Sequence, residues 1–300
     1  MTSEGPLPLC RQHTPLQEPI PPAIWTLFCC WNLPSFEAGG PMIPGSFSRG
    51  FLLLAVIALI VAGCKTVAPD RSISPVVKKP SRILFVGNSF TFWRGGLSRH
   101  MKALSDAMTP PLGYETSSVV RGGASLEVMW TQTDAAQQIA TGNWDVVILQ
   151  EDLPETNVDS FRKYSHKFVQ AVRDVGARPI LFMAWEYDRL NWISLDEIID
   201  AHRKMSAELQ VEVAPVGLAW RNSRSIKPDL DMYARDREHP SVAGMYLSLM
   251  VIEATISGAD PRSRDPEPLP IRGLKRLDHE GTEFLRGIAH QSINEWKAPR

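Results

Sequence analysis

The sequence lacks cysteine over most of its length. All four cysteines lie at or before position 64: Cys10, Cys29, Cys30 and Cys64. Residues 65–300 can therefore hold no disulfide, no thiolate metal site and no cysteine nucleophile. An excess of one charge is also missing, because 32 Lys and Arg stand against 33 Asp and Glu. A nucleic-acid-binding protein would show a basic face or stripe, so this balance argues against nucleic acid as a partner.

Long apolar runs are equally absent. The only strongly apolar stretch, residues 51–63, has 13 residues, whereas a helix that spans a bilayer needs about 20. Arg49 precedes the stretch and the small residues Ala62 and Gly63 end it, which is the pattern of an export signal. Residues 61–64 (Val-Ala-Gly-Cys) resemble the bacterial lipobox, so Cys64 is expected to carry lipid and to become the first mature residue. The alternative is a buried core helix that ends in a cysteine.

The residues on either side of this signal divide the chain. A start at Met42 gives a leader of 22 residues (42–63), within the usual range of about 15–30. Residues 1–41 are therefore interpreted as an over-extended, disordered start, with a cytoplasmic extension as the alternative. Residues 64–80 are polar and contain proline, which is typical of a tether, and residues 81–300 are expected to form one domain. Because Lys65 rather than Asp follows Cys64, the resemblance to lipoproteins implies anchoring at the outer membrane, facing the periplasm.

Strand and helix patterns alternate through residues 81–300. Five short apolar runs are predicted as strands, over residues 82–86, 115–120, 145–150, 178–185 and 211–216. Helices are predicted over residues 95–107, 126–140, 160–175, 195–209, 241–257 and 277–296. Apolar strands separated by helices indicate an α/β fold with a parallel sheet covered on both faces. In such sheets, ligands bind beyond the carboxyl ends of the strands.

Polar residues follow the predicted strands where a site is expected. Ser89 follows the first strand, Gly123 follows the second, and Gln150 ends the third. Asp236 and His239 lie late in the chain, directly before a predicted helix. A serine hydroxyl is a weak nucleophile that needs a base within reach, itself oriented by a third group. The spacing of Asp236 and His239 lets the carboxylate hold one ring nitrogen while the other faces the serine.

The same residues carry a resemblance to a known family. Three segments resemble sequence blocks of the SGNH (GDSL-type) hydrolases: Gly87-Asn88-Ser89-Phe90, Gly123-Ala124-Ser125 and Asp236-Arg237-Glu238-His239-Pro240-Ser241. These proteins are serine esterases and acyl hydrolases, and the resemblance covers about residues 82–261. Asn88 and Phe90 depart from the commonest Asp and Leu. The third block of the family, Gly-x-Asn-Asp, is absent, and residues 147–150 (Val-Ile-Leu-Gln) stand in its place.

The resemblance implies a flavodoxin-like, three-layer α/β/α fold with five parallel strands, and a serine mechanism. Ser89 would be the nucleophile, His239 the base and then the acid, and Asp236 the group that orients the imidazole. The backbone N–H groups of Ser89 and Gly123, with the side-chain amide of Gln150, would form the oxyanion hole. This chemistry requires no metal and no organic cofactor.

The substrate and the activity leave alternatives open. We expect an ester hydrolase of the cell envelope that deacylates a carbohydrate or another acyl ester. The alternative is a catalytically silent, glycan-binding lipoprotein with the same fold. A nucleotide-binding protein fits less well, because the turn at Ser89 lacks a glycine-rich phosphate-binding run. A substrate rim is expected from residues that follow the fourth and fifth strands, although aromatic residues are more often core: Trp185, Glu186, Tyr187 and Trp220.

Overall fold

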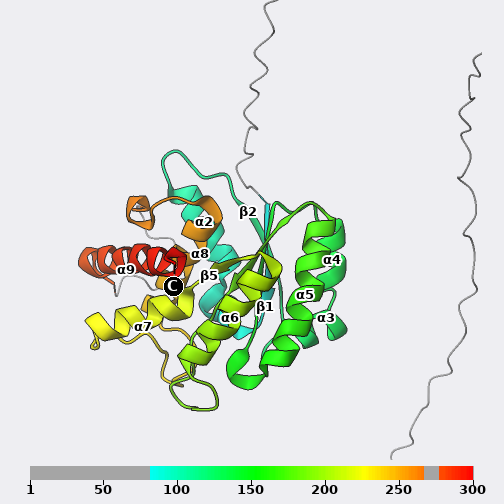
Figure 1. Cartoon of the computed structure of the whole chain (residues 1–300). Coiled ribbons are helices and arrows are strands. Elements are labelled where there is room, and N and C mark those ends of the chain that lie inside the picture. Colours follow the sequence, from blue (N-terminus) through cyan, green and yellow to red (C-terminus); the bar gives the residue numbers. More distant parts are fainter. Residues whose placement is uncertain (1–81, 267–276, 300) are drawn as a thin grey trace, which may run out of the picture. The chain divides into compact units, whose positions relative to one another are not determined.

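A five-stranded parallel sheet forms the centre of the structure, a computed structural model that describes residues 82–266 and 277–299. The strands are β1 (Arg82–Gly87), β2 (Glu115–Val120), β3 (Val146–Gln150), β4 (Arg178–Phe182) and β5 (Glu212–Ala214). Their order in the sheet is β2-β1-β3-β4-β5, and every neighbouring pair is parallel (Figure 1). The predicted α/β fold with a five-stranded parallel sheet is confirmed.

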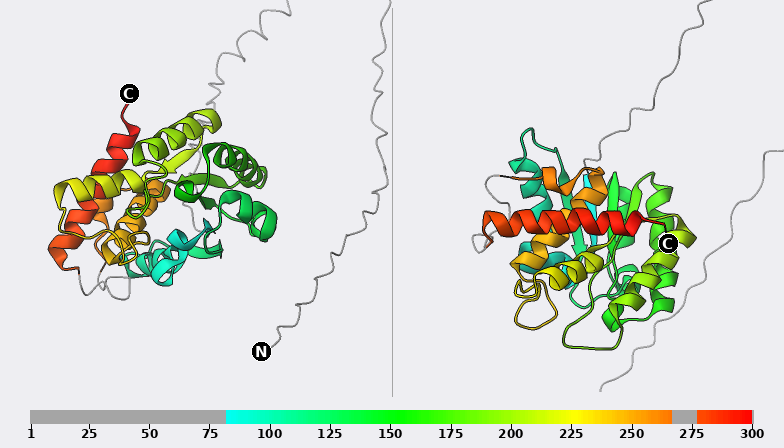
Figure 2. Two further views of the ribbon diagram at one scale, coloured as in Figure 1. Left: turned by 90° about the horizontal axis from the view of Figure 1, so that it is seen from below. Right: turned by 60° about the vertical axis from the view of Figure 1, so that its left-hand side comes forward.

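Helices cover both faces of the sheet, because successive side chains of a strand point to opposite faces. On one face, Ile83 and Phe85 of β1 share a hydrophobic cluster with α2 (Leu97–Ala107), α7 (Val216–Ile226), α8 (Val242–Ser257) and α9 (His279–Lys297). On the other face, Leu84 and Val86 share a cluster with α3 (Leu126–Gln132), α4 (Ala135–Thr141), α5 (Val158–Asp174) and α6 (Leu195–Leu209). The two further views in Figure 2 show the resulting three layers. Short helical turns are α1 (Ser89–Phe92), η2 (Trp93–Gly95), η3 (Leu153–Glu155) and η4 (Pro261–Ser263).

Helix α8 is buried on nearly all sides and is apolar all round, as expected for a helix covered by other elements. It contacts β5 and the helices α2, α7 and α9. Ser241 caps its N-terminus by accepting the N–H of Gly244 at 3.1 Å. Gly244 allows close packing, because a Cβ there would lie 2.4 Å from the carbonyl oxygen of Met232. The loop that carries His239 therefore leads directly into the most enclosed helix of the domain.

Two helical regions differ from the prediction. The helix predicted over 126–140 is divided into α3 and α4, because Thr133 is extended and its hydroxyl accepts the N–H of Ala135 at 3.2 Å. Helix α7 is missed by the sequence pattern, which extends the fifth strand to residue 216. The strand ends at Ala214, and Gly217 brings the first turn of α7 against the segment after β4. A Cβ at Gly217 would lie 2.3 Å from the carbonyl oxygen of Ala184.

The predictions for the first part of the chain lie outside the described residues. They are the start over residues 1–41, the leader over 42–63, lipidation of Cys64 and the tether over 64–80. They stay predictions. Within residues 82–266 and 277–299, no helix combines the length and the apolar character needed to cross a membrane.

Candidate active site

The carboxyl ends of β1, β2 and β3 bring three predicted site residues to one edge of the sheet. β1 lies between β2 and β3, and Gly87 at its end is in register with the last residue of β2. Ser89, Gly123 and Gln150 follow or end these three strands. They therefore share the edge at which parallel α/β sheets bind their ligands.

Ser89 lies in a sharp turn between β1 and α1. Asn88 has an extended backbone (φ −108°, ψ −152°), and its side chain caps α1 by accepting the N–H of Phe90 at 3.0 Å. Gly87 is required in this turn, because a Cβ there would lie 2.5 Å from Oε1 of Gln150. The Ser89 side chain is half-buried, and its hydroxyl has no hydrogen-bond partner among the described residues. The hydroxyl is thus available for reaction.

Gly123 lies in the turn that follows β2. Its φ of +62° is in the left-handed region, which favours glycine. The turn is fixed beside β1, since the N–H of Arg121 donates to the carbonyl of Gly87 at 3.1 Å. In the part of the chain that the structure describes, neither the N–H of Gly123 nor that of Ser89 has a hydrogen-bond partner. Free N–H groups at one sheet edge are the kind of donor that an oxyanion hole uses.

Gln150 is fully buried, and its side chain contacts the turn that carries Ser89. Its Oε1 accepts the N–H of Asn88 at 2.8 Å and the hydroxyl of Thr91 at 3.1 Å. Its Nε2 donates to the carbonyl of Glu151 at 2.9 Å. These bonds support a role in fixing the turn. They give no support to the oxyanion role of Gln150, which stays a prediction.

Asp236 and His239 form the contact that their spacing predicts. Oδ2 of Asp236 lies 3.0 Å from Nδ1 of His239. Oδ1 accepts the backbone N–H groups of His239 at 2.9 Å and of Glu238 at 3.1 Å, so one carboxylate orients both the ring and the loop. Partial burial works to raise the pKa of Asp236, but these two N–H groups and the His239 ring outweigh it and hold that pKa below its usual value. Nε2 makes no hydrogen bond among the described residues, lies 3.8 Å from a carboxylate oxygen of Glu238, and is the ring nitrogen left to exchange a proton.

The His239 ring lies against the helical segment that begins at Ser89. Trp93 stacks on it, with ring centroids 3.8 Å apart and planes 15° apart. Phe90 meets it edge-on at 6.0 Å. The segment of the predicted nucleophile and the loop of the predicted base therefore meet at this ring. No hydrogen bond joins the Ser89 hydroxyl to His239 among the described residues, and such catalytic bonds are often long before substrate binds.

Side chains from neighbouring loops contact the loop that carries His239, called here the histidine loop. Nε1 of Trp185, after β4, donates to the carbonyl of Glu238 at 2.9 Å. Arg189 pairs with Glu238 at 2.6 Å and with Glu155, in the loop after β3, at 3.1 Å. The loops that follow β3 and β4 are therefore joined to the loop that holds His239.

The three aromatic members of the predicted substrate rim are buried, so their role at a substrate stays a prediction. Trp185 and Trp220 are each 1% exposed, and Tyr187 is 4% exposed. Trp185 and Trp220 stack with ring centroids 3.7 Å apart and planes 4° apart, which removes both rings from solvent. Glu186 is half-buried, and its carboxylate caps α6 by accepting the N–H of Leu195 at 2.8 Å.

Two exposed aromatic side chains that the sequence pattern does not single out lie in segments beside the site. Phe92, at the end of α1, is 37% exposed and lies near the turn of Gly122. Trp192 is 69% exposed and lies in the loop between β4 and α6. The same loop carries Arg189, which contacts the histidine loop. Their exposure, rather than their position in the sequence, distinguishes these rings from the buried ones.

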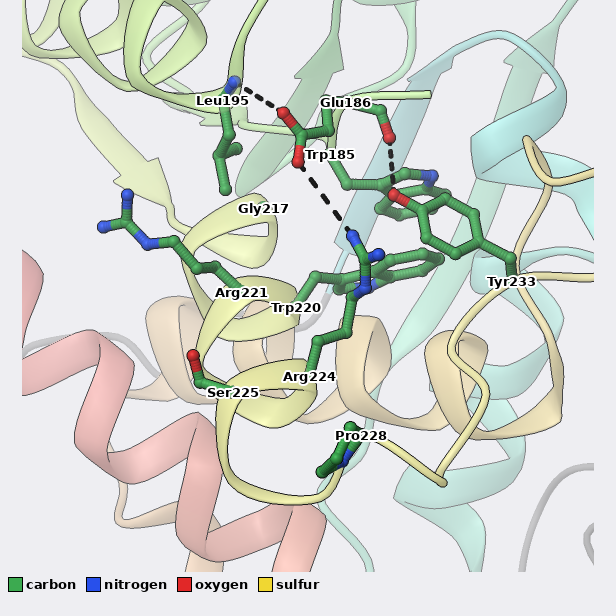
Figure 3. A pocket seen from close by; sticks show the side chains of 10 residues that line it. All are labelled: Trp185, Glu186, Leu195, Gly217, Trp220, Arg221, Arg224, Ser225, Pro228 and Tyr233. Atoms are coloured by element: carbon green, nitrogen blue, oxygen red, sulfur yellow. Dashed lines mark hydrogen bonds and ion pairs between the residues drawn. The ribbon is translucent and has the colours of Figure 1, made fainter. Parts of the chain in front are cut away.

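A pocket of about 310 Å³ lies beside the buried aromatic stack (Figure 3). Trp185, Glu186 and Trp220 line it together with Arg224 and Tyr233. The hydroxyl of Tyr233 donates to the carbonyl of Glu186 at 2.7 Å, and Arg224 lies 4.0 Å from the Glu186 carboxylate. Nε1 of Trp220 has no hydrogen-bond partner among the described residues, and no residue of the predicted triad lines the pocket.

Two acidic side chains, Glu151 and Asp152, are buried directly after Gln150. Glu151 accepts the N–H of Leu126, at the start of α3, at 3.2 Å and the N–H of Asp152 at 2.8 Å. Burial raises the pKa of Glu151 to about 7 and that of Asp152 to about 7. Perturbed carboxyl groups of this kind often mark functional sites.

Comparison with known proteins identifies the fold. No family profile matches the chain, and no curated protein matches it. A solved structure of a DUF4886 family protein from Bacteroides uniformis is similar, with a TM-score of 0.57 and 16% identity, over 73% of this chain and 97% of that one. At this identity the match shows that the two chains share a fold.

Solved structures similar to this chain also include proteins of the family whose motifs the sequence resembles. A candidate SGNH hydrolase from Slackia heliotrinireducens matches 59% of this chain and 99% of its own length, with 26% identity and a TM-score of 0.48. The acetylxylan esterase Axe2 from Geobacillus stearothermophilus matches 60% of this chain and 96% of its own, with 18% identity and a TM-score of 0.49.

Proposed function

We propose that the chain is an SGNH-type serine hydrolase that cleaves carboxylic esters. The observation that carries the proposal is the Asp236–His239 contact at 3.0 Å, with the ring stacked on the segment that begins at Ser89. A carboxylate on Nδ1 leaves Nε2 to act as base, and the Ser89 hydroxyl has no competing partner among the described residues. The match of these residues to the family's blocks supports the same roles.

The proposed reaction begins when Oγ of Ser89 attacks the ester carbonyl carbon and its proton passes to Nε2 of His239. Asp236 stabilises the imidazolium that forms and keeps the ring in place. The negative charge on the carbonyl oxygen is held by the N–H groups of Ser89 and Gly123. His239 then returns the proton to the leaving alcohol, and an acyl group remains on Ser89. Water activated by His239 releases the carboxylic acid and restores the enzyme.

The proposed substrate is a carbohydrate that carries an acyl group, or another acyl ester of the cell envelope. Exposed rings of Phe92 and Trp192 support a site that can stack against a sugar. A screen of acetylated sugars against longer-chain esters tests this assignment. Preference for long acyl chains on simple alcohols would contradict the carbohydrate substrate and leave the hydrolase standing.

Labelling with a fluorophosphonate tests the hydrolase itself against a silent glycan-binding protein. The wild-type protein should become labelled at Ser89, and Ser89→Ala should remain unlabelled. Ser125→Ala is the matched control, because Ser125 lies at the same sheet edge but only caps α3, by accepting the N–H of Val128 at 3.2 Å. Absence of labelling in the wild-type protein, together with binding of glycan, would favour the silent protein.

Attachment to the outer membrane through lipid on Cys64 is a proposal that rests on the sequence alone. Several acyl chains, as lipoproteins carry, would make attachment stable, whereas one chain anchors only marginally. Cys64→Ser should move the protein from the membrane fraction to the soluble fraction. Deletion of residues 1–41 should leave export unchanged if translation starts at Met42.

A further inference from the structure

The side chain of Asn88 makes two different hydrogen bonds directly before Ser89. Its Oδ1 accepts the N–H of Phe90 at 3.0 Å, and its Nδ2 donates to Oδ2 of Asp152 at 2.6 Å. Asn88 is completely buried and Asp152 is 2% exposed, so neither side chain can exchange its partner for water. An amide can accept at one atom and donate at the other, as this position requires.

Asp152 is held in turn by a residue that follows β4. The hydroxyl of Tyr187 lies 2.9 Å from Oδ1 and 3.0 Å from Oδ2 of Asp152. The Tyr187 ring packs edge-on against Phe90, with centroids 5.5 Å apart. Asp152 therefore joins the turn that carries Ser89 to the loop after β4.

Two residues at and just after the end of β3 form hydrogen bonds with Asn88. Gln150 accepts its backbone N–H at 2.8 Å, and Asp152 accepts its side-chain amide. The bond from Asn88 to Phe90 shapes α1 at the residue after Ser89. A shift of the Asn88 side chain would therefore shift the backbone on both sides of the Ser89 hydroxyl.

We propose that Asp152 is a positioning residue that acts through Asn88 to set the Ser89 turn, and that Asn88 and Asp152 work as a matched donor and acceptor. The effect of this pair on catalysis rests on the proposed function of Ser89 as the nucleophile. The pair also accounts for the asparagine in place of the commonest aspartate of the family's first block. With Asp152 2.6 Å away, an aspartate at position 88 would oppose two carboxylate oxygens.

The charge state of Asp152 depends on its burial and on four neighbouring side chains. Burial raises its pKa to about 7, and the carboxylates of Glu155 and Glu238 act in the same direction. The hydrogen bonds from Tyr187 and from Asn88 oppose them. Measurements of the pair therefore belong at about pH 8.5, where the carboxylate is the major form.

An exchange of the two residues tests the proposal. In Asn88→Asp/Asp152→Asn, the new carboxylate at position 88 still accepts the N–H of Phe90. Its second oxygen accepts the new amide at position 152, whose oxygen accepts the hydroxyl of Tyr187. The hydrogen bond between the two positions is then restored with donor and acceptor exchanged, and the bonds from Phe90 and Tyr187 keep their direction. Each single substitution instead either removes a hydrogen bond of the Asn88–Asp152 pair or places two like groups, such as two carboxylates, against each other.

We expect each single variant to lose about 10- to 100-fold in kcat, with a smaller change in KM, as for the loss of one hydrogen bond to a charged group. The exchange variant should recover most of this loss. Asn88→Asp alone should regain activity as the pH falls, because one proton shared between the two carboxyl groups removes their repulsion. Asn157→Asp is the matched control, since Asn157 is exposed and only caps α5, a position that Asp fills equally well.

Two outcomes would overturn the proposal. One is an exchange variant whose loss in kcat equals the product of the two single losses. The other is single variants with wild-type kcat, which would leave the pair without a positioning role. If the wild-type protein hydrolyses no ester, the hydrolase proposal fails by itself. The pair is then judged by the free energy of unfolding of the four proteins, which should show the same loss and recovery.

Discussion

Trp93 stacks on the imidazole of His239, with ring centroids 3.8 Å apart and planes inclined by 15°. The tryptophan lies in the helical segment that follows Ser89, whereas the histidine belongs to the loop before α8. Asp236 fixes the ring through Nδ1, and Trp93 fixes its plane. The predicted base is thus held both from its own loop and from the segment of the predicted nucleophile.

The first prediction concerns this stack. Trp93→Ala should lower kcat by about 3- to 10-fold, because an aromatic pair contributes about 0.5–1.5 kcal/mol. Trp93→Phe should keep most of the activity, since a smaller ring can still cover the imidazole. Steady-state kinetics on an activated acetyl ester measure both. Equal losses in the two variants would show that the volume of tryptophan matters, rather than the stacked ring.

The second prediction separates the members of the triad. Ser89→Ala and His239→Ala should each lower kcat by on the order of 10⁶, whereas Asp236→Asn should lower it by on the order of 10⁴. The smaller effect follows because Asp236 orients and stabilises the ring but transfers no proton. Folding of each variant is checked by circular dichroism. Turnover at the wild-type rate in Ser89→Ala would remove Ser89 from the mechanism.

The third prediction decides between two roles of Gln150. Since its Oε1 accepts the N–H of Asn88, Gln150→Ala leaves a buried donor unpaired and should lower the free energy of unfolding by about 1–3 kcal/mol. The value of kcat should fall with it, because the Ser89 turn loses its support. Urea unfolding and kinetics are measured on the same preparation. A fall in kcat of about 10²–10³ at unchanged stability would instead restore the oxyanion role.

The fourth prediction uses the buried carboxyl group of Glu151. Burial raises its pKa to about 7 in the folded protein, above the value of an unfolded chain. The folded state therefore holds the proton more tightly, and this contribution to stability is present below about pH 4.5 and is lost as the pH rises toward 7. Glu151→Gln cannot ionise at this position. Its free energy of unfolding should therefore rise by about 1–3 kcal/mol relative to that of wild type as the pH increases from 5 to 8.

The comparison in this fourth test must be between the two proteins, because other groups also titrate. Burial lowers the pKa of His202 to about 4, so His202 stabilises the fold increasingly as the pH rises from 4 to 6.5. That slope has the opposite sign and is common to both proteins. Parallel stability curves for wild type and Glu151→Gln would show that Glu151 is ionised throughout this range.

Local signals in the sequence predict the fold well. Ser194 and Glu197 form the capping box that begins α6, and the five predicted strands coincide with the five strands of the sheet. The Asp236–His239 contact is equally local, since the two residues share one loop. What the sequence does not give is the set of partners from distant elements. Gln150 contacts the turn after another strand, and only the packed structure shows that its amide is already bonded.

The burial of the aromatic residues also depends on distant partners. Trp185 and Trp220 come from different segments, and each ring is covered by the other. Trp185 follows β4 and Trp220 lies in α7, after β5, and residues that rim a site occupy the same kind of position. Burial depends on how the layers pack. The position of a residue after a strand therefore does not show whether it is buried in the core or lines a cleft.

The burial of α8 has a consequence for the timing of activity. A ribosome completes β1 and Ser89 early and the loop with His239 late, and that loop is placed only when α8 packs among its neighbours. In the proposed mechanism, a nascent or truncated chain carries a nucleophile without its base. Ester cleavage then begins only once α8 has packed and the loop with His239 is in place, so folding of the late part of the chain is itself the step that switches the enzyme on.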